Sequence, residues 1–272
     1  MIVDTHTHVV APDERAYPLS PRPLSGEWYR KAPCSAEGLL ERMDASGVDR
    51  AILVQALGAY SYDNRYATDS AAAHPDRFVA ACCVDPEADD PVGELSFQVE
   101  ARGAQGVRLF AISKGASWLA EERTFPLWER AAELGAHVIV TILGHQLDEL
   151  RQVLERFPEI PVSLDHCGFP DVADPSPLFA LADLPNLHLK LTTHALDAAA
   201  EAFGSAGGFV ASLVERFGAD RVMWGSDFCQ THDRSYGQLV KLGAEAFAGL
   251  PKASREACLG GNALRLWPAL RG

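Results

Sequence analysis

The chain has 272 residues and a formal net charge of −13, from 24 basic and 37 acidic side chains. Hydrophobic residues make up 47% of it and charged residues 22%, which is typical of a globular protein and excludes a disordered chain. An acidic surface repels phosphate backbones, so we expect a small-molecule substrate and no nucleic-acid partner.

The cysteines and the N-terminus indicate the compartment. The six cysteines include no C-x-x-C pair, so we expect them to be reduced and mostly buried. The chain starts with no basic region followed by an apolar one, and no stretch approaches about 18 apolar residues. We therefore expect a cytoplasmic protein without a signal peptide or membrane contact.

Short apolar or β-branched runs recur along the chain and predict eight strands. They begin near residues 2, 48, 77, 104, 136, 160, 186 and 221. Most starts are about 25–35 residues apart, which leaves room for one helix and two loops between parallel strands. Eight such units match a (β/α)8 TIM barrel, so we predict an α/β fold in which residues 1–272 form one domain.

The segments between these runs predict helices. Ser35 is a candidate N-cap for a helix that ends at Gly47, and apolar stripes predict helices from Phe125 to Gly135 and over 147–157. We expect further helices over 63–74, 197–217, 235–249 and, with Asn262 as N-cap, 263–268. Segment 11–34, which contains five prolines, is predicted to be an extended loop over the barrel mouth.

His6 and His8 are the sharpest feature of the sequence. Residues two apart on a strand face the same side, so both imidazoles can donate a lone pair to one divalent metal. Asp227 ends the last predicted strand, where functional side chains of such barrels gather. Its carboxylate can ligate the same metal, accept a proton from the attacking water, or both. The alternative for Asp227 is a helix N-cap.

The segment Asp165-His166-Cys167-Gly168 follows the sixth predicted strand. His166 can bind the metal or polarise a substrate carbonyl, and its alternative is a structural histidine that lines the barrel. Strand alternation predicts that Asp165 and Cys167 point to the other side. Cys167 and Cys229 lack the partners of a nucleophilic cysteine, so we expect neither to react.

Five further residues are candidates for substrate contact. Arg108 is a candidate clamp for a carboxylate, because a guanidinium matches that group in bidentate fashion. Lys190 has a similar place on the seventh strand. His145 and His194 are each either a third histidine ligand or a substrate contact, and Tyr62 lies in the loop after the second strand. The alternative for each is an ordinary strand-end or loop residue.

Four segments together resemble the amidohydrolase superfamily, in the amidohydrolase-2 group that contains lactonases, such as 2-pyrone-4,6-dicarboxylate hydrolase, and aminocarboxymuconate-type decarboxylases. The segments are residues 2–8, 164–170, 223–228 and 261–266. The resemblance implies a (β/α)8 barrel of the metal-dependent hydrolase type. It implies His6, His8 and Asp227 at the metal-ligand positions, and His166 as the histidine of strand 6.

The fifth strand departs from the decarboxylase pattern. Decarboxylase-like members have a histidine at the end of this strand, where this chain has Thr141-Ile142-Leu143 and places His145 beyond it. The segment 165–168 is more similar to the lactonase branch, some members of which work without a metal. The cofactor we expect is one divalent metal per chain, zinc first and manganese next, or none.

The sequence thus predicts a hydrolase of a small, carboxylated cyclic ester or a related C–O or C–N bond, with water activated by Asp227. A metal-dependent decarboxylase of the same superfamily is the first alternative. A barrel that binds a ligand without chemistry is the second. Barrels of this kind often pair, so a homo-oligomer is an open expectation.

Overall fold

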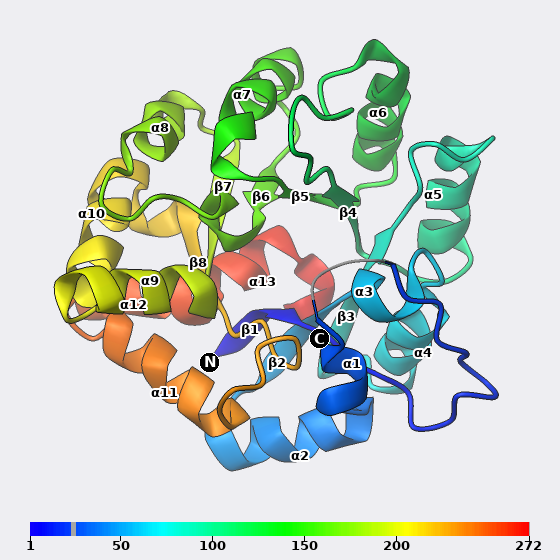
Figure 1. The fold of residues 1–272 in the computed structure, drawn as a ribbon, viewed down its shortest axis with the longest axis horizontal. Coiled ribbons are helices and arrows are strands. Elements are labelled where there is room, and N and C mark those ends of the chain that lie inside the picture. The colour runs from blue at the N-terminus through cyan, green and yellow to red at the C-terminus, as the bar shows by residue number, and fades with distance from the viewer. Residues whose placement is uncertain (23–25, 272) are drawn as a thin grey trace.

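The computed structural model describes residues 1–22 and 26–271. Eight parallel strands form one sheet in the order of the sequence, with helices outside it (Figure 1). The strands are β1 (Val3–Thr7), β2 (Arg50–Val54), β3 (Phe78–Cys83), β4 (Gly106–Phe110), β5 (His137–Thr141), β6 (Val162–Leu164), β7 (Leu187–Thr192) and β8 (Val222–Gly225). The predicted (β/α)8 barrel is confirmed, and each strand lies where an apolar run predicts it.

The sheet closes between β1 and β8 through a short contact. Thr7 and Phe228 form an isolated parallel bridge, and the backbone N–H of Asp227 donates to the carbonyl of His6 at 2.8 Å. The pairing of β1 with β2 also shifts register between Asp4 and Thr7. The closing seam therefore holds His6 and Asp227 side by side, although they are far apart in the sequence.

Helices of eight or more residues surround the barrel. They are α2 (Ala36–Ser46), α4 (Arg65–Ala73), α5 (Pro91–Glu100), α6 (Phe125–Glu133), α7 (Leu147–Arg156), α9 (Thr193–Phe203), α10 (Gly207–Phe217) and α11 (Tyr236–Ala246). Shorter helices are α1 (Trp28–Lys31), α3 (Leu57–Tyr60), α8 (Ser176–Phe179), α12 (Lys252–Glu256) and α13 (Asn262–Leu266). None of the helices in the described ranges is both long and apolar enough to cross a membrane.

The predicted limits of α2 are confirmed by its caps. The Ser35 side chain accepts a hydrogen bond from the Gly38 backbone N–H, and Gly47 ends the helix with a left-handed φ of 70°. Two other helical regions differ from the prediction. The single helix expected over 197–217 is two helices separated at Gly204, which has a left-handed φ of 78°. Helix α5 was not predicted, although the Asp90 side chain caps it.

Asn262 does not act as the predicted N-cap. It lies inside a continuous helical segment, and its side-chain amide donates to the carbonyls of Ala219 and Val222 at 2.7 and 2.9 Å. Asn262 therefore ties the C-terminal helices to the start of β8.

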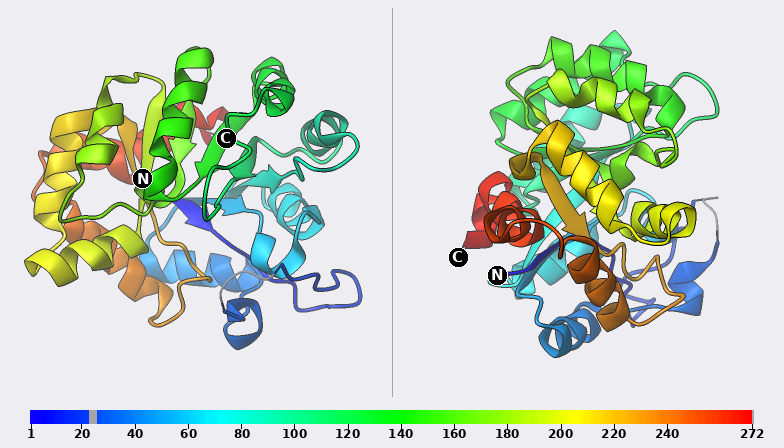
Figure 2. Two further views of the ribbon diagram at one scale, coloured as in Figure 1. Left: turned by 45° about the horizontal axis from the view of Figure 1, so that its top comes forward. Right: turned by 90° about the vertical axis from the view of Figure 1, so that its left-hand side faces the viewer.

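The chain termini lie at the opposite end of the barrel from α1 (Figure 2). Trp267 and Leu270 plug this lower end and pack against inward-facing side chains of the strands, among them Ile52, Ile139 and Met223. Gly106 at the start of β4 leaves room for the Trp267 ring, because an added Cβ would lie 2.4 Å from it and 2.7 Å from a backbone oxygen. The functional site must therefore lie at the other end.

We predict that Gly106→Ala lowers the free energy of unfolding by about 1–3 kcal/mol, because the new methyl group overpacks the plug. Gly208→Ala is the matched control, because nothing lies within 4 Å of its added Cβ. That change should leave the free energy of unfolding unaltered or raise it by up to about 1 kcal/mol through helix propensity. Urea denaturation measures both, and equal stabilities of the two variants would contradict the packing argument.

Candidate active site

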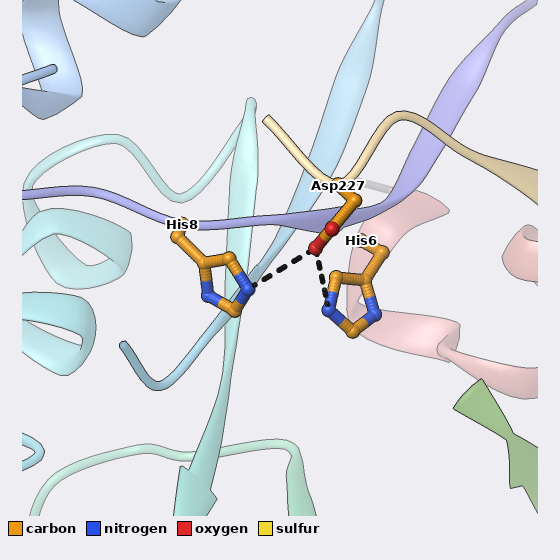
Figure 3. A group of neighbouring side chains, drawn as sticks. All are labelled: His6, His8 and Asp227. Atoms are coloured by element: carbon orange, nitrogen blue, oxygen red, sulfur yellow. Dashed lines mark ion pairs between the residues drawn. The ribbon is translucent and has the colours of Figure 1, made fainter. Parts of the chain in front are cut away.

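Three side-chain atoms converge where β1 meets β8, and none of them donates a hydrogen bond to another. Oδ1 of Asp227 lies 3.5 Å from Nε2 of His6 and 3.5 Å from Nε2 of His8 (Figure 3). All three atoms are buried and have no hydrogen-bond partner among the described residues. Together the three residues form a geometrically suitable group for one metal ion.

The hydrogen bonds on the far side of each ring fix its tautomer. Nδ1 of His8 lies 2.8 Å from the carbonyl oxygen of Val54, which can only accept, so Nδ1 carries the proton. Nδ1 of His6 lies 3.0 Å from a carboxylate oxygen of Asp165 and carries its proton for the same reason. Both Nε2 atoms therefore present lone pairs toward Asp227.

Asp227 is ionised although it is completely buried. Burial alone raises the pKa of its carboxyl group, but the hydrogen bond from His194 holds that pKa well below its usual range. Its second oxygen, Oδ2, lies 2.9 Å from Nε2 of His194 and 3.2 Å from the hydroxyl of Thr231. Two lone pairs and one carboxylate oxygen therefore converge with no donor among them, and such a set fits a cation.

The backbone conformation also marks this site. Asp227 has a φ of 61° and His166 a φ of 56°, in the left-handed region that residues other than glycine rarely adopt. Such strain persists only where surrounding contacts impose it, and it gathers at functional sites.

His166 lies beside the three converging atoms. Its ring centroid is 4.8 Å from that of His6, and its Nδ1 is 2.7 Å from the hydroxyl of Thr192. Burial lowers the pKa of His166 to about 4, so the ring is neutral near pH 7. His166 lies outside the group formed by His6, His8 and Asp227. That His166 acts as a fourth metal ligand stays a prediction.

The prediction that Asp165 points away from His166 was wrong. Strand β6 ends at Leu164, and residues 165–168 form a tight turn in which His166 and Cys167 are left-handed. The alternation of a strand therefore stops one residue early, and Asp165 lies completely buried among the site's polar side chains. No signal in the sequence reveals such a turn. Cys167 is buried and lies 3.6 Å from the carbonyl oxygen of Lys190.

A cavity of about 360 Å³ opens above these residues. His8, Arg108, His166 and His194 line it, together with apolar and uncharged side chains from strand ends, short helices and loops: Trp28, Leu57, Phe110, Ile112, Thr141, Phe169 and Gln230. The ring of Trp28 is 5.6 Å from that of His8. Trp28 belongs to segment 11–34, which was predicted to be a loop over the barrel mouth. Residues 23–25 of this segment lie outside the described residues.

Arg108 and His194 line the cavity, where the sequence places substrate-binding residues, and their role in binding stays a prediction. Nε of Arg108 is 2.8 Å from Asp165, and no described residue bonds its terminal Nη atoms. The hydrogen bond to Asp227 raises the pKa of His194, whose side chain is 47% exposed.

Three other predicted substrate contacts lie elsewhere. Lys190 is completely buried below the site, with Nζ 3.3 Å from Asp165, because β7 turns this residue into the barrel interior. His145 is exposed and pairs with the carbonyl oxygen of Ser113 at 3.1 Å. The hydroxyl of Tyr62 pairs with Arg22. None of the three lines the cavity, so the structure does not place them where a substrate would bind.

We predict that Asp227→Asn stabilises the metal-free protein. The amide can keep its oxygen toward His194 and turn its NH2 group to a histidine lone pair, which satisfies a buried acceptor and gains about 1–2 kcal/mol. Urea denaturation in a chelator tests this, with the exposed Asp89→Asn as control. A destabilised Asp227→Asn protein would contradict the assignment of three facing acceptors.

Comparison with known proteins identifies relatives of this chain. Two relatives are a 2-pyrone-4,6-dicarboxylate hydrolase of Comamonas testosteroni, 28% identical over 83% of this chain and 76% of its own, and an L-fucono-1,5-lactonase of Burkholderia ambifaria, 26% identical over 83% and 79%.

Solved structures share the fold. A candidate 2-pyrone-4,6-dicarboxylic acid hydrolase from Pseudomonas putida matches with a TM-score of 0.78 and 23% identity, covering 98% of this chain and 97% of that one. A 2,6-dihydroxybenzoate decarboxylase from Rhizobium matches with a TM-score of 0.72 and 16% identity, covering 100% and 99%. The amidohydrolase family model matches residues 3–269. This chain belongs to the amidohydrolase family and is an enzyme of that superfamily.

Proposed function

We propose that this enzyme hydrolyses a small, carboxylated lactone. The observation that carries the proposal is one cavity lined by His8, His194 and the free end of the Arg108 guanidinium. The buried carboxylate of Asp227 lies directly behind the two histidines. The Asp227 carboxylate suits water activation, and the guanidinium suits a carboxylate on the substrate. The names of the two relatives, both lactone hydrolases, support the same reaction class.

His6, His8 and Asp227 would hold one divalent metal, with zinc the first candidate for a set rich in histidine and manganese the second. When bound, such an ion polarises a carbonyl and lowers the pKa of water. That contribution matters here because a carboxylate with a depressed pKa is a weak base toward ordinary water.

In the proposed reaction Asp227 accepts the proton of the attacking water. His194, bonded to Oδ2 of Asp227 and half-exposed to the cavity, keeps the carboxylate oriented and ionised. The backbone N–H of Asp227 is tied to β1, so the carboxylate has a fixed position at the seam. Such preorganisation removes the cost of arranging the base during the reaction.

His166 would polarise the lactone carbonyl. When the Thr192 hydroxyl donates to Nδ1, the neutral ring presents its Nε2–H as a donor to the cavity that it lines. A neutral donor aimed at developing negative charge stabilises the transition state of acyl transfer.

Decarboxylation is the competing reaction class. The fold alone does not separate the two, because a solved decarboxylase shares it. At the end of β5 this chain has Thr141, whose hydroxyl donates to Asp165 at 2.8 Å. The histidine typical of the decarboxylase-like members is therefore absent at this place, which favours hydrolysis.

We predict that Asp227→Asn abolishes hydrolysis of 2-pyrone-4,6-dicarboxylate and of L-fucono-1,5-lactone, the two probes suggested by the relatives. A loss of at least about 10³-fold in kcat is expected for removal of the base. Base consumption at constant pH measures ring opening, and CO2 trapping measures decarboxylation. Near-normal turnover by the variant, or CO2 as the product of the wild type, would refute the proposal.

We predict that Arg108→Lys raises KM for the dicarboxylate about 10–100-fold and leaves KM for the neutral sugar lactone within about threefold, since only the first probe offers a bidentate partner. Steady-state kinetics with both probes tests the clamp. An equal change for both probes would show that Arg108 acts on the site as a whole rather than on a substrate carboxylate.

A further inference from the structure

We propose that Asp165 is the positioning residue of this site. One oxygen of its carboxylate sets the metal-binding tautomer of His6, and the other oxygen aims Arg108 at the substrate. The part that concerns the substrate rests on the proposed function. The part that concerns His6 does not depend on the reaction.

Asp165 contacts four polar side chains of the site through its two carboxylate oxygens. Oδ1 lies 3.0 Å from Nδ1 of His6 and 3.3 Å from Nζ of Lys190. Oδ2 lies 2.8 Å from Nε of Arg108 and 2.8 Å from the hydroxyl of Thr141. The carboxylate is completely buried, so no solvent competes for these contacts.

The contact with His6 decides which ring nitrogen is free. An ionised carboxylate only accepts hydrogen bonds, so it holds the proton on Nδ1 and leaves a lone pair on Nε2. Nε2 is the atom that faces Asp227. A partner of this kind on the far nitrogen fixes the orientation of a metal-ligating histidine and raises its basicity.

The contact with Arg108 decides where the guanidinium points. Nε is anchored inside the barrel, and the side chain continues to the cavity wall. The planar fork is thereby fixed at one corner, which leaves the terminal nitrogens for an anionic group. Both functions of the site, metal binding and anion binding, therefore depend on the same residue.

Lys190 balances the charge of this arrangement. Its Nζ has no hydrogen-bond partner of good geometry in the described chain, and its nearest carboxylate is Asp165. Burial raises the pKa of Asp165, but His6, Lys190 and Arg108 together hold that pKa well below its usual range. Removal of Asp165 alone would leave a buried lysine without a counter-charge, which is strongly destabilising.

The experiment is therefore a double variant, Asp165→Leu with Lys190→Met, compared with the wild type and with Lys190→Met alone. Replacing a buried ion pair by apolar residues of similar volume generally preserves a fold. The double variant removes one charge of each sign, so its net charge at the site equals that of the wild type, and a weaker affinity for zinc than the wild type has does not come from net charge. Lys190→Met alone is one unit more negative at the site, and it is the reference for the His6 tautomer.

We expect the double variant to bind zinc about 10–100-fold more weakly than the wild type, which has the same net charge at the site, in competition with a chromophoric chelator. Nitrogen-15 NMR of the metal-free proteins should show His6 with its proton on Nδ1 in Lys190→Met and a mixture of tautomers in the double variant. Asp165→Asn with Lys190→Met keeps one acceptor, so it should recover part of the affinity. If the first double variant does not fold, this second one against the wild type carries the same comparison.

Zinc affinity within twofold of the wild type, together with an unchanged His6 tautomer, would overturn the inference. Failure of the proposed function gives a different result. A wild-type protein that takes up no zinc contradicts the metal assignment, while the NMR comparison still decides the role of Asp165. With the dicarboxylate as substrate, the double variant should also show a raised KM that the neutral lactone does not share.

Discussion

The structure depends on one electrostatic constraint at the closing seam of the barrel. Three buried acceptor atoms, from His6, His8 and Asp227, face one another with no donor among the described residues. Facing acceptors in a low-dielectric interior repel, so folding of this end of the barrel has a cost unless a cation is present. The fold imposes the arrangement because the backbone N–H of Asp227 is bonded to the carbonyl of His6.

Hydrogen bonds from neighbouring residues hold the three side chains in this arrangement. Val54 and Asp165 hold the far nitrogens of the two histidines, and His194 holds the far oxygen of the carboxylate. Left-handed backbone at Asp227 and at His166 turns these side chains inward at the points where their strands end. The lower end of the barrel is a packed apolar plug, so the polar groups are confined to the mouth.

Much of this could be predicted from the sequence, because periodicity and spacing report what regular strands do. The eight apolar runs identify the eight strands, and the pair His6 and His8 follows the two-residue repeat of β1. Prediction failed where the backbone leaves regular geometry. Asp165 follows a strand whose alternation stops one residue early, at a turn with two left-handed residues.

Lys190 and His145 show two further limits of sequence reasoning. The sequence pattern places Lys190 near the end of the seventh strand and so near the mouth. Its side chain instead lies beneath the site and neutralises Asp165. His145 lies beyond the end of β5, where the chain has already turned outward. A strand-end position therefore predicts proximity to the mouth, whereas only the packing of neighbouring side chains decides which residues reach the cavity.

The most direct test of the central claim is the metal content of the purified, untagged protein, measured by elemental analysis after growth in medium with zinc and manganese. The account predicts about one equivalent of zinc or manganese per chain, as expected for one site with three protein ligands. A folded protein that retains no metal would contradict it, and it would mean that Asp227 and the histidines act on a lactone without one.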